Sequence, residues 1–334
     1  MTPPPRECTR NRDDAAADAR TPADRAIGDS ATRHREASRL VSVFTPFADG
    51  WLRTDPDGTS ATSIPSDSFR LALQRRCGLW LSDFVDGATT LWSRGVPMDF
   101  YGDYTDGRTN HNRRHGAALR TWYDAIAAVA HTPVVLGDKL QPAATAHFNE
   151  GHVPDICEPG GGPGGSDHIT EIKVCTPVAA SHAAGRGSAV NGGTPTSVGH
   201  LHAFGNTEEK LRLVNLGCRE RGHPSQPPLD HATGRGWVKA RRGCYHDALV
   251  RKRSTVCLTL HESIGGGFSP PAAARLHSLA RVAKAGADRT RYSARHRVSY
   301  LRHHAQRIST SIVKADAAAM LHSSRRLVAS LQRM

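Results

Sequence analysis

The stretch HVPDICEPGGGPGGSDHITEIKVCTP, residues 152–177, has two short apolar segments on either side of a glycine-rich loop. The apolar segments contain strand-forming residues, and the Gly and Pro residues between them are typical of a turn. The sequence therefore predicts a β-hairpin. Both strands carry acidic residues, so the hairpin is either a surface element with ordinary charges or the frame of a metal-dependent active site.

The register of this hairpin follows from taking Pro163 as the centre of the turn. Asp155 lies eight residues before Pro163 and Glu171 eight residues after it. In an antiparallel pair these two residues lie opposite each other, with Cβ atoms about 5 Å apart on one face. Lys173 is two residues beyond Glu171 and shares that face. Asp167 shares it as well if the strand begins that early.

Two carboxylates at this separation repel each other, and a divalent cation between them removes that cost. Ligation by oxygen alone suits Mg²⁺, or Mn²⁺ in its place. Such a metal lowers the pKa of a bound water, and a nearby Lys steadies the charge on a phosphate. Asp155, Glu171 and Lys173 therefore predict phosphodiester hydrolysis. The alternative is a set of cross-strand ion pairs on a solvated face. Apolar neighbours favour a central hairpin: Val153, Ile156, Ile169, Ile172 and Val174.

Charge is distributed unevenly along the 334 residues, whose net charge is +13. Residues 1–200 carry 20 Lys and Arg against 23 Asp and Glu, whereas residues 201–334 carry 24 against 8. A basic half of this kind indicates a surface that faces a polyanion, most often nucleic acid.

Several classes of protein are disfavoured by the sequence. No apolar run reaches the 18 to 20 residues, roughly, that a membrane span needs. The first residues lack the apolar region of a secretory signal. The seven cysteines are scattered without a CxxC pair, which argues against a disulfide framework and a cysteine zinc site. We therefore expect an intracellular protein in a reducing compartment.

Hydrophobic periodicity predicts an α/β protein. Ser269 and Pro270 are typical of a helix start, and Gly286 of a helix end. The expected helices and strands are, in chain order, a helix at 66–82, a helix from 113, a strand at 132–140, the two hairpin strands, a helix at 236–253, a strand at 254–263, a helix at 270–285 and a last helix from about 296.

Pro154-Asp155, followed after fifteen residues by Glu171-Ile172-Lys173, resembles the PD-(D/E)XK nuclease superfamily. The expected order of helix, three-stranded meander, helix and strand is that of its restriction-endonuclease-like core. The short sequence motifs that flank the hairpin, over residues 66–312, resemble the C-terminal region downstream of reverse transcriptase in retroelement polyproteins. These motifs are FRLALQRRCGL, DFYGDYTDG, RRHGAALRTWYDAI, VCLTLHESIGGG and HHAQRIS.

The resemblance implies that Asp155 and Glu171 bind the metal and that Lys173 assists catalysis. Many members carry a further acidic residue in the first helix, for which this chain offers Asp124, with Asp138 after the first strand as the alternative. Asp138 is taken as the third metal ligand. The retroelement region also has a Cys and His knuckle, which is absent here, where Tyr104 replaces an expected His. The sequence has no polymerase motif, so a reverse transcriptase partner would lie on another chain or be lost.

Basic residues between 236 and 253 are candidates for contacts with phosphates. The alternative is a solvated helix face, which also resembles a nuclear-localisation cluster. Glu262 fits a strand-end turn, and His303 and His304 fit surface or phosphate-facing positions. The candidate nucleic-acid-binding residues are Lys239, Arg241, Arg242, Arg251, Lys252 and Arg253.

The expected organisation is a disordered arm at 1–40, a helical and loop-rich region at 41–112, a core at 113–265 and C-terminal helices at 266–334. The core contains a loop insertion at 179–236. The leading expectation is a Mg²⁺-dependent DNA endonuclease of retroelement origin. The alternatives are a nucleic-acid-binding domain of the same fold without cleavage, and a scaffold with no role on nucleic acid.

Overall fold

The chain forms a mixed sheet covered by helices, which confirms the expected α/β class. The computed structural model describes residues 39–40, 42–53, 63–79, 91–93, 96–98, 108–139, 153–175, 245, 248, 252–285 and 297–331. The loop insertion expected at 179–236 lies outside these residues, as do residues 1–38 of the arm expected at 1–40 and most of the helix expected at 236–253. Residues 39–40 are helical, so the expected arm is too long at its end.

The central sheet has four strands in the order β3-β4-β5-β6. The first three strands form an antiparallel meander, and β6 lies parallel to β5. A separate antiparallel pair is formed by β1 (Leu91–Ser93) and β2 (Val96–Met98). The central strands are β3 (Val135–Leu136), β4 (Ile156–Glu158), β5 (His168–Cys175) and β6 (Thr255–Glu262).

The helices match the expected positions, with differences at their ends. The helix expected from residue 113 begins five residues earlier, and the one expected at 66–82 ends at Arg76. The first expected strand shrinks to two residues, because the chain turns into the 3-10 segment η3 (Gly137–Lys139). The helices are η1 (Gly50–Arg53, 3-10), α3 (Ser66–Arg76), α4 (Arg108–Ala127), α9 (Pro270–Ala285) and α10 (Arg297–Leu331).

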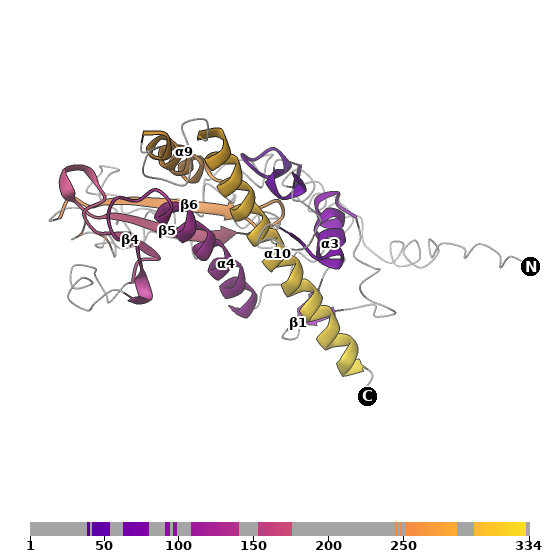
Figure 1. The fold of residues 1–334 in the computed structure, drawn as a ribbon. Helices are drawn as coiled ribbons and strands as arrows, with labels where there is room; N and C mark the ends of the chain where they lie inside the picture. The colour runs from indigo at the N-terminus through magenta and orange to yellow at the C-terminus, as the bar shows by residue number, and fades with distance from the viewer. Residues whose placement is uncertain are drawn as a thin grey trace, which may run out of the picture.

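One face of the sheet packs against α4, α9 and α10. Figure 1 shows α10 running across the strands. Ile172 and Val174 of β5 point to this side and pack against Trp122 of α4. Cys157 and Ile169 point to the other side, where they contact Tyr245 and Ala248. Since strand side chains alternate between faces, β5 is buried on both faces. None of the helices in the described part of the chain combines the length and the apolar character needed to cross a membrane.

Two features hold the helices in place. Ser269 caps α9, since its Oγ accepts the backbone N–H of Ala272 at 3.4 Å, which confirms the predicted start. Asp316 of α10 pairs with Arg75 of α3 and, at 2.7 Å, with Arg114 of α4. All three side chains of this ionic cluster are almost fully buried. The cluster therefore joins three helices at one point beside the sheet.

Candidate functional site

The glycine-rich turn fixes the register of the β4–β5 hairpin. Gly160, Gly164 and Gly165 have φ between 66° and 77°, a region that favours glycine. Asp167 belongs to this turn, because its Oδ1 accepts the N–H of Gly160 at 3.1 Å. The observed pairing of Ile156 with Thr170 confirms the predicted register. Continued by one residue, it places Asp155 opposite Glu171.

Asp155 lies where the β4–β5 pairing ends. Its Oδ2 accepts the backbone N–H of Ile172 at 2.7 Å, and its Oδ1 lies 3.1 Å from Nε2 of His115 in α4. Burial by itself raises the pKa of Asp155, but His115, the Ile172 N–H and the charge of Lys173 together lower it below its ordinary value. Asp155 is therefore an anion at neutral pH, and its side chain is 15% exposed.

Glu171 occupies the middle of β5 and is 2% exposed. The hydroxyl of Tyr245, itself fully buried, donates a hydrogen bond to Glu171 Oε1. The hydroxyl of Thr259 on β6 donates to the Glu171 backbone carbonyl at 2.8 Å. The Glu171 carboxylate is thus held from the side of the sheet where Tyr245 lies.

Lys173 lies two residues beyond Glu171 on β5. By strand alternation it shares the face of Glu171, and it is half-buried. Its charge is also one of the causes that lower the pKa of Asp155. The partners of the carboxylates come from different layers, His115 from α4 and Tyr245 from the opposite side. The predicted register is observed in the backbone, but the expectation of one shared face is not, because the Asp155 carboxylate is held from the side of α4 and that of Glu171 from the opposite side of the sheet.

Asp138 lies at the same end of the sheet but points outward. The N–H of its neighbour Gly137 donates to the Asp155 carbonyl at 3.1 Å. A Cβ on Gly137 would lie 1.6 Å from the carbonyl oxygen of Pro154, so only glycine allows this approach. The Asp138 side chain is 69% exposed, and its Oδ2 lies 3.7 Å from Lys139 Nζ. Asp138 is thus near Asp155 in the backbone, with its carboxylate in solvent.

Asp124, the other candidate acidic residue, is directed to α10. Its Oδ2 accepts a hydrogen bond from Arg307 at 2.7 Å, on the exposed side of α4. The side chain that α4 places beside Asp155 is His115. Sequence analysis missed both His115 and Tyr245. The motif RRHG, residues 113–116, stands at the start of the apolar face of α4 and could have pointed to His115. The contact between Tyr245 and Glu171 joins residues 74 positions apart, which no local motif indicates.

The donor set suits a hard cation held by few protein ligands. Within the described residues, no group of three or more His, Cys, Asp or Glu side chains is arranged to hold a metal ion. Mg²⁺ is commonly held by one or two carboxylates together with waters and substrate phosphates. Each carboxylate oxygen accepts more than one partner, so the bonds to Asp155 and Glu171 leave acceptor capacity. Asp155 and Glu171 thus offer oxygen ligands of the kind that Mg²⁺ and Mn²⁺ take.

The basic candidates are only partly described. Lys239, Arg241, Arg242 and Arg251 lie outside the described residues. Lys252 and Arg253 are exposed just before β6. Thr255 pairs with His168, four residues before Ile172, so Thr255 lies about 13 Å along the strand direction from Asp155. Lys252 and Arg253 precede Thr255, on its side away from Asp155.

Glu262 and the histidine pair have structural surroundings. Glu262, fully buried at the end of β6, accepts hydrogen bonds from Ser42 and from the N–H of Gly267, as expected for a strand-end turn. The prediction that His304 is a surface residue is wrong, because His304 is 1% exposed and stacks 4.4 Å from Tyr300. It lies one turn after Tyr300 on the inner side of α10, whereas His303 is exposed.

Comparison with protein-family models, curated proteins and solved structures finds no match to this chain.

Proposed function

We propose that this chain is a Mg²⁺-dependent endonuclease with a restriction-endonuclease-like core that cleaves DNA. The observation that carries the proposal is the register of the hairpin, which sets Asp155 opposite Glu171 with the charge of Lys173 acting on Asp155. The order of α4, a three-stranded meander and a parallel strand supports it as well.

Each residue of the cluster has a separate role in this proposal. Asp155 and Glu171 hold the Mg²⁺ ion, which when bound offsets charge on the phosphate and activates a water. His115 and the Ile172 N–H orient the Asp155 carboxylate, and Tyr245 orients that of Glu171. The Lys173 ammonium group orients the attacking water and stabilises negative charge on the phosphate oxygens.

The charge of the second part of the chain supports a nucleic-acid substrate. Residues 201–334 carry sixteen more basic than acidic residues, which favours binding to a polyanion. Exposed Lys252 and Arg253, just before β6, would contact the sugar-phosphate backbone at a distance from the cluster along the sheet. The same proposal includes a retroelement origin, a reverse transcriptase on another chain and a nuclear location. These parts rest on sequence motifs alone.

A nucleic-acid-binding domain of the same fold without cleavage is the second candidate. The observation that favours it is the Asp138 side chain, which lies in solvent, so that among the described residues only Asp155 and Glu171 remain of the three predicted metal ligands. A two-carboxylate site binds metal weakly when substrate phosphates are absent. The two candidates differ in one property, the cleavage of a bound strand.

The test is the nicking of supercoiled plasmid with Mg²⁺, Mn²⁺ or a chelator. We expect nicking by the wild type with either metal, and a loss of at least about 100-fold in Asp155→Asn and in Lys173→Met. Asp67→Asn and Arg281→Gln, which change exposed residues of α3 and α9, serve as charge-matched controls. Plasmid binding without nicking by any of the proteins would support the second candidate and contradict the first.

A further inference from the structure

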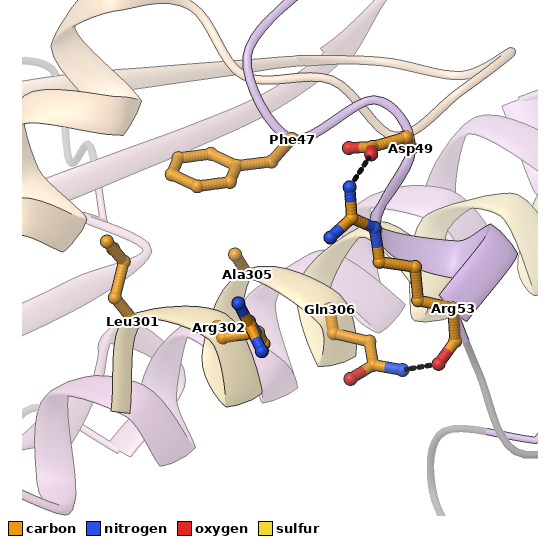
Figure 2. A pocket seen from close by; sticks show the side chains of 8 residues that line it. Phe47, Asp49, Arg53, Leu301, Arg302, Ala305 and Gln306 are labelled. Carbon is orange, nitrogen blue, oxygen red and sulfur yellow. Dashed lines mark hydrogen bonds and ion pairs between the residues drawn. The ribbon is translucent and has the colours of Figure 1, made fainter. Parts of the chain in front are cut away.

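A groove of about 510 Å³ lies between η1 and α10, on elements different from those that carry Asp155 (Figure 2). Its two ends differ in character. Phe47, Leu301 and Ala305 form an apolar end, whereas Asp49 and Gln306 belong to a polar end. A volume of this size accommodates a small ligand of the dimensions of a mononucleotide.

The ring of Phe47 is held in the groove by an unusual backbone conformation. Phe47 has a φ of 62°, in the left-handed region that a bulky residue rarely adopts. Its ring meets that of Phe268 edge to face, with centroids 5.0 Å apart. The N–H of Phe268 also donates to the Pro46 carbonyl at 2.9 Å. The fold therefore maintains a flat apolar surface at this end at some conformational cost.

The polar end is already organised by contacts within the protein. Arg53 donates to Asp49 Oδ2 at 2.6 Å, so the charges of these two side chains offset each other. Gln306 Nε2 donates to the Arg53 carbonyl at 2.7 Å, which fixes the amide. The Gln306 side-chain oxygen has no protein partner among the described residues. This end thus presents an oriented acceptor with no net charge.

Arg302 supplies the charge of the groove. Its guanidinium group lies at the edge between the two ends, is exposed and has no hydrogen-bond or ionic partner among the described residues. With Arg53 neutralised by Asp49, the groove carries one positive charge beside an apolar wall. The matching ligand has a flat apolar ring and an acidic group a few bonds away.

We propose that this groove binds a nucleoside monophosphate unit, either as a free nucleotide or as the unpaired end of a nucleic-acid strand. The base lies against Phe47 and Leu301, as bases stack on aromatic side chains in single-strand sites. The phosphate accepts hydrogen bonds from Arg302, whose planar donors suit phosphate oxygens. A donor group on the base reaches the Gln306 side-chain oxygen. This site goes beyond the proposed cleavage reaction and does not require it.

The test titrates the full-length chain with adenosine 5′-monophosphate, adenosine and inorganic phosphate by calorimetry at low salt. We expect the monophosphate to bind more tightly than either fragment. Arg302→Gln should weaken its binding at least about tenfold, because it removes a charge-assisted contact. Arg281→Gln removes an equally exposed arginine from α9, outside the groove, and should leave the binding unchanged.

A second variant addresses the apolar end. Phe47→Gly removes the ring and suits the positive φ at this position, so it should weaken the binding of the monophosphate and of adenosine alike. Circular dichroism compares its fold with that of the wild type. The Arg302→Gln result stands without this variant, since Arg302 is exposed and outside the core.

The source of the ligand follows from competition with short single strands. A strand with a 5′-phosphate that displaces the monophosphate better than a strand with a 5′-hydroxyl indicates a strand end, and failure of both strands indicates a free nucleotide. Either result agrees with the proposal. Binding no tighter than that of adenosine or phosphate, equal binding by wild type and Arg302→Gln, or equal weakening by Arg281→Gln would overturn it.

Discussion

Asp155 and Glu262 lie beside the same strand, β5, yet their environments affect their acidity in opposite directions. Asp155, next to Ile172, has a lowered pKa because His115, a backbone N–H and Lys173 outweigh the effect of burial. Glu262, paired with Cys175 across β5 and β6, has its pKa raised to about 7, because burial outweighs its bonds to Ser42 and the glycine loop. Neighbouring cations and donors, more than residue type, therefore separate a carboxylate with a lowered pKa from one with a raised pKa.

The largest effect is expected from breaking the backbone that presents Asp155. Gly137→Ala places a Cβ against the Pro154 carbonyl, and β3 and η3 must move away from Asp155. We expect a loss of about 4 kcal/mol or more in the free energy of unfolding, measured by urea denaturation. Gly116→Ala, where a Cβ meets no atom within 4 Å, is the matched control and should not destabilise the protein. Equal stability of the two variants would show that the close approach is absent.

The next effect sharpens the contrast through pH. Since the folded pKa of Glu262 exceeds the ordinary value of 4.5, its contribution to stability is fully present below pH 4.5 and is lost as pH rises through about 7. Glu262→Gln removes this titration. As pH rises from 5 to 8, the free energy of unfolding of Glu262→Gln should increase relative to that of wild type by at most roughly 3 kcal/mol, measured from denaturant unfolding curves.

Asp155→Asn provides the opposite sign. Because the folded pKa of Asp155 is lowered, its contribution is present above its ordinary pKa of 3.8 and is lost as pH falls through the folded value. The stabilisation of wild type relative to Asp155→Asn should therefore decrease in acid, as pH falls below 3.8. For each variant, the quantity compared is the free energy of unfolding of wild type minus that of the variant. If this difference changed with pH in the same direction for Glu262→Gln and Asp155→Asn, the contrast between the two carboxylates would be contradicted.

A smaller effect is expected from the donor to Glu171. Tyr245→Phe removes the hydroxyl that donates to Glu171 Oε1 in a buried site. A buried acceptor left without its donor costs about 1–3 kcal/mol. Thermal unfolding measures this cost, and Tyr123→Phe, which alters a tyrosine that is only partly buried, is the control. Loss of nicking in Tyr245→Phe with unchanged stability would assign Tyr245 to catalysis rather than to positioning.

The parts of this fold that the sequence predicted are those set by local patterns. The glycine turn around Pro163 determined the hairpin register, and Ser269 with Pro270 marked the start of α9. Alternation placed Ile172 and Val174 on one face of β5. These features follow from turn chemistry, capping and strand periodicity, which act within a few residues.

The partners of the site residues depend on contacts between distant segments. The contacts of His115 with Asp155 and of Tyr245 with Glu171 join residues 40 and 74 positions apart. The burial of His304 depends on which side of α10 meets the sheet and α9, which periodicity at the start of that helix does not determine. Sequence analysis therefore located the carboxylates and the lysine but not the side chains that orient them.

The most direct test of the metal site compares Mn²⁺ binding by wild type, Asp155→Asn and Glu262→Gln, followed by electron paramagnetic resonance in the presence of duplex DNA. The site at Asp155 and Glu171 predicts that wild type and Glu262→Gln bind Mn²⁺ equally, because Glu262 is buried away from the cluster. Asp155→Asn should bind at least about tenfold more weakly. Equal Mn²⁺ binding by Asp155→Asn and wild type would contradict the assignment of this cluster as the metal site.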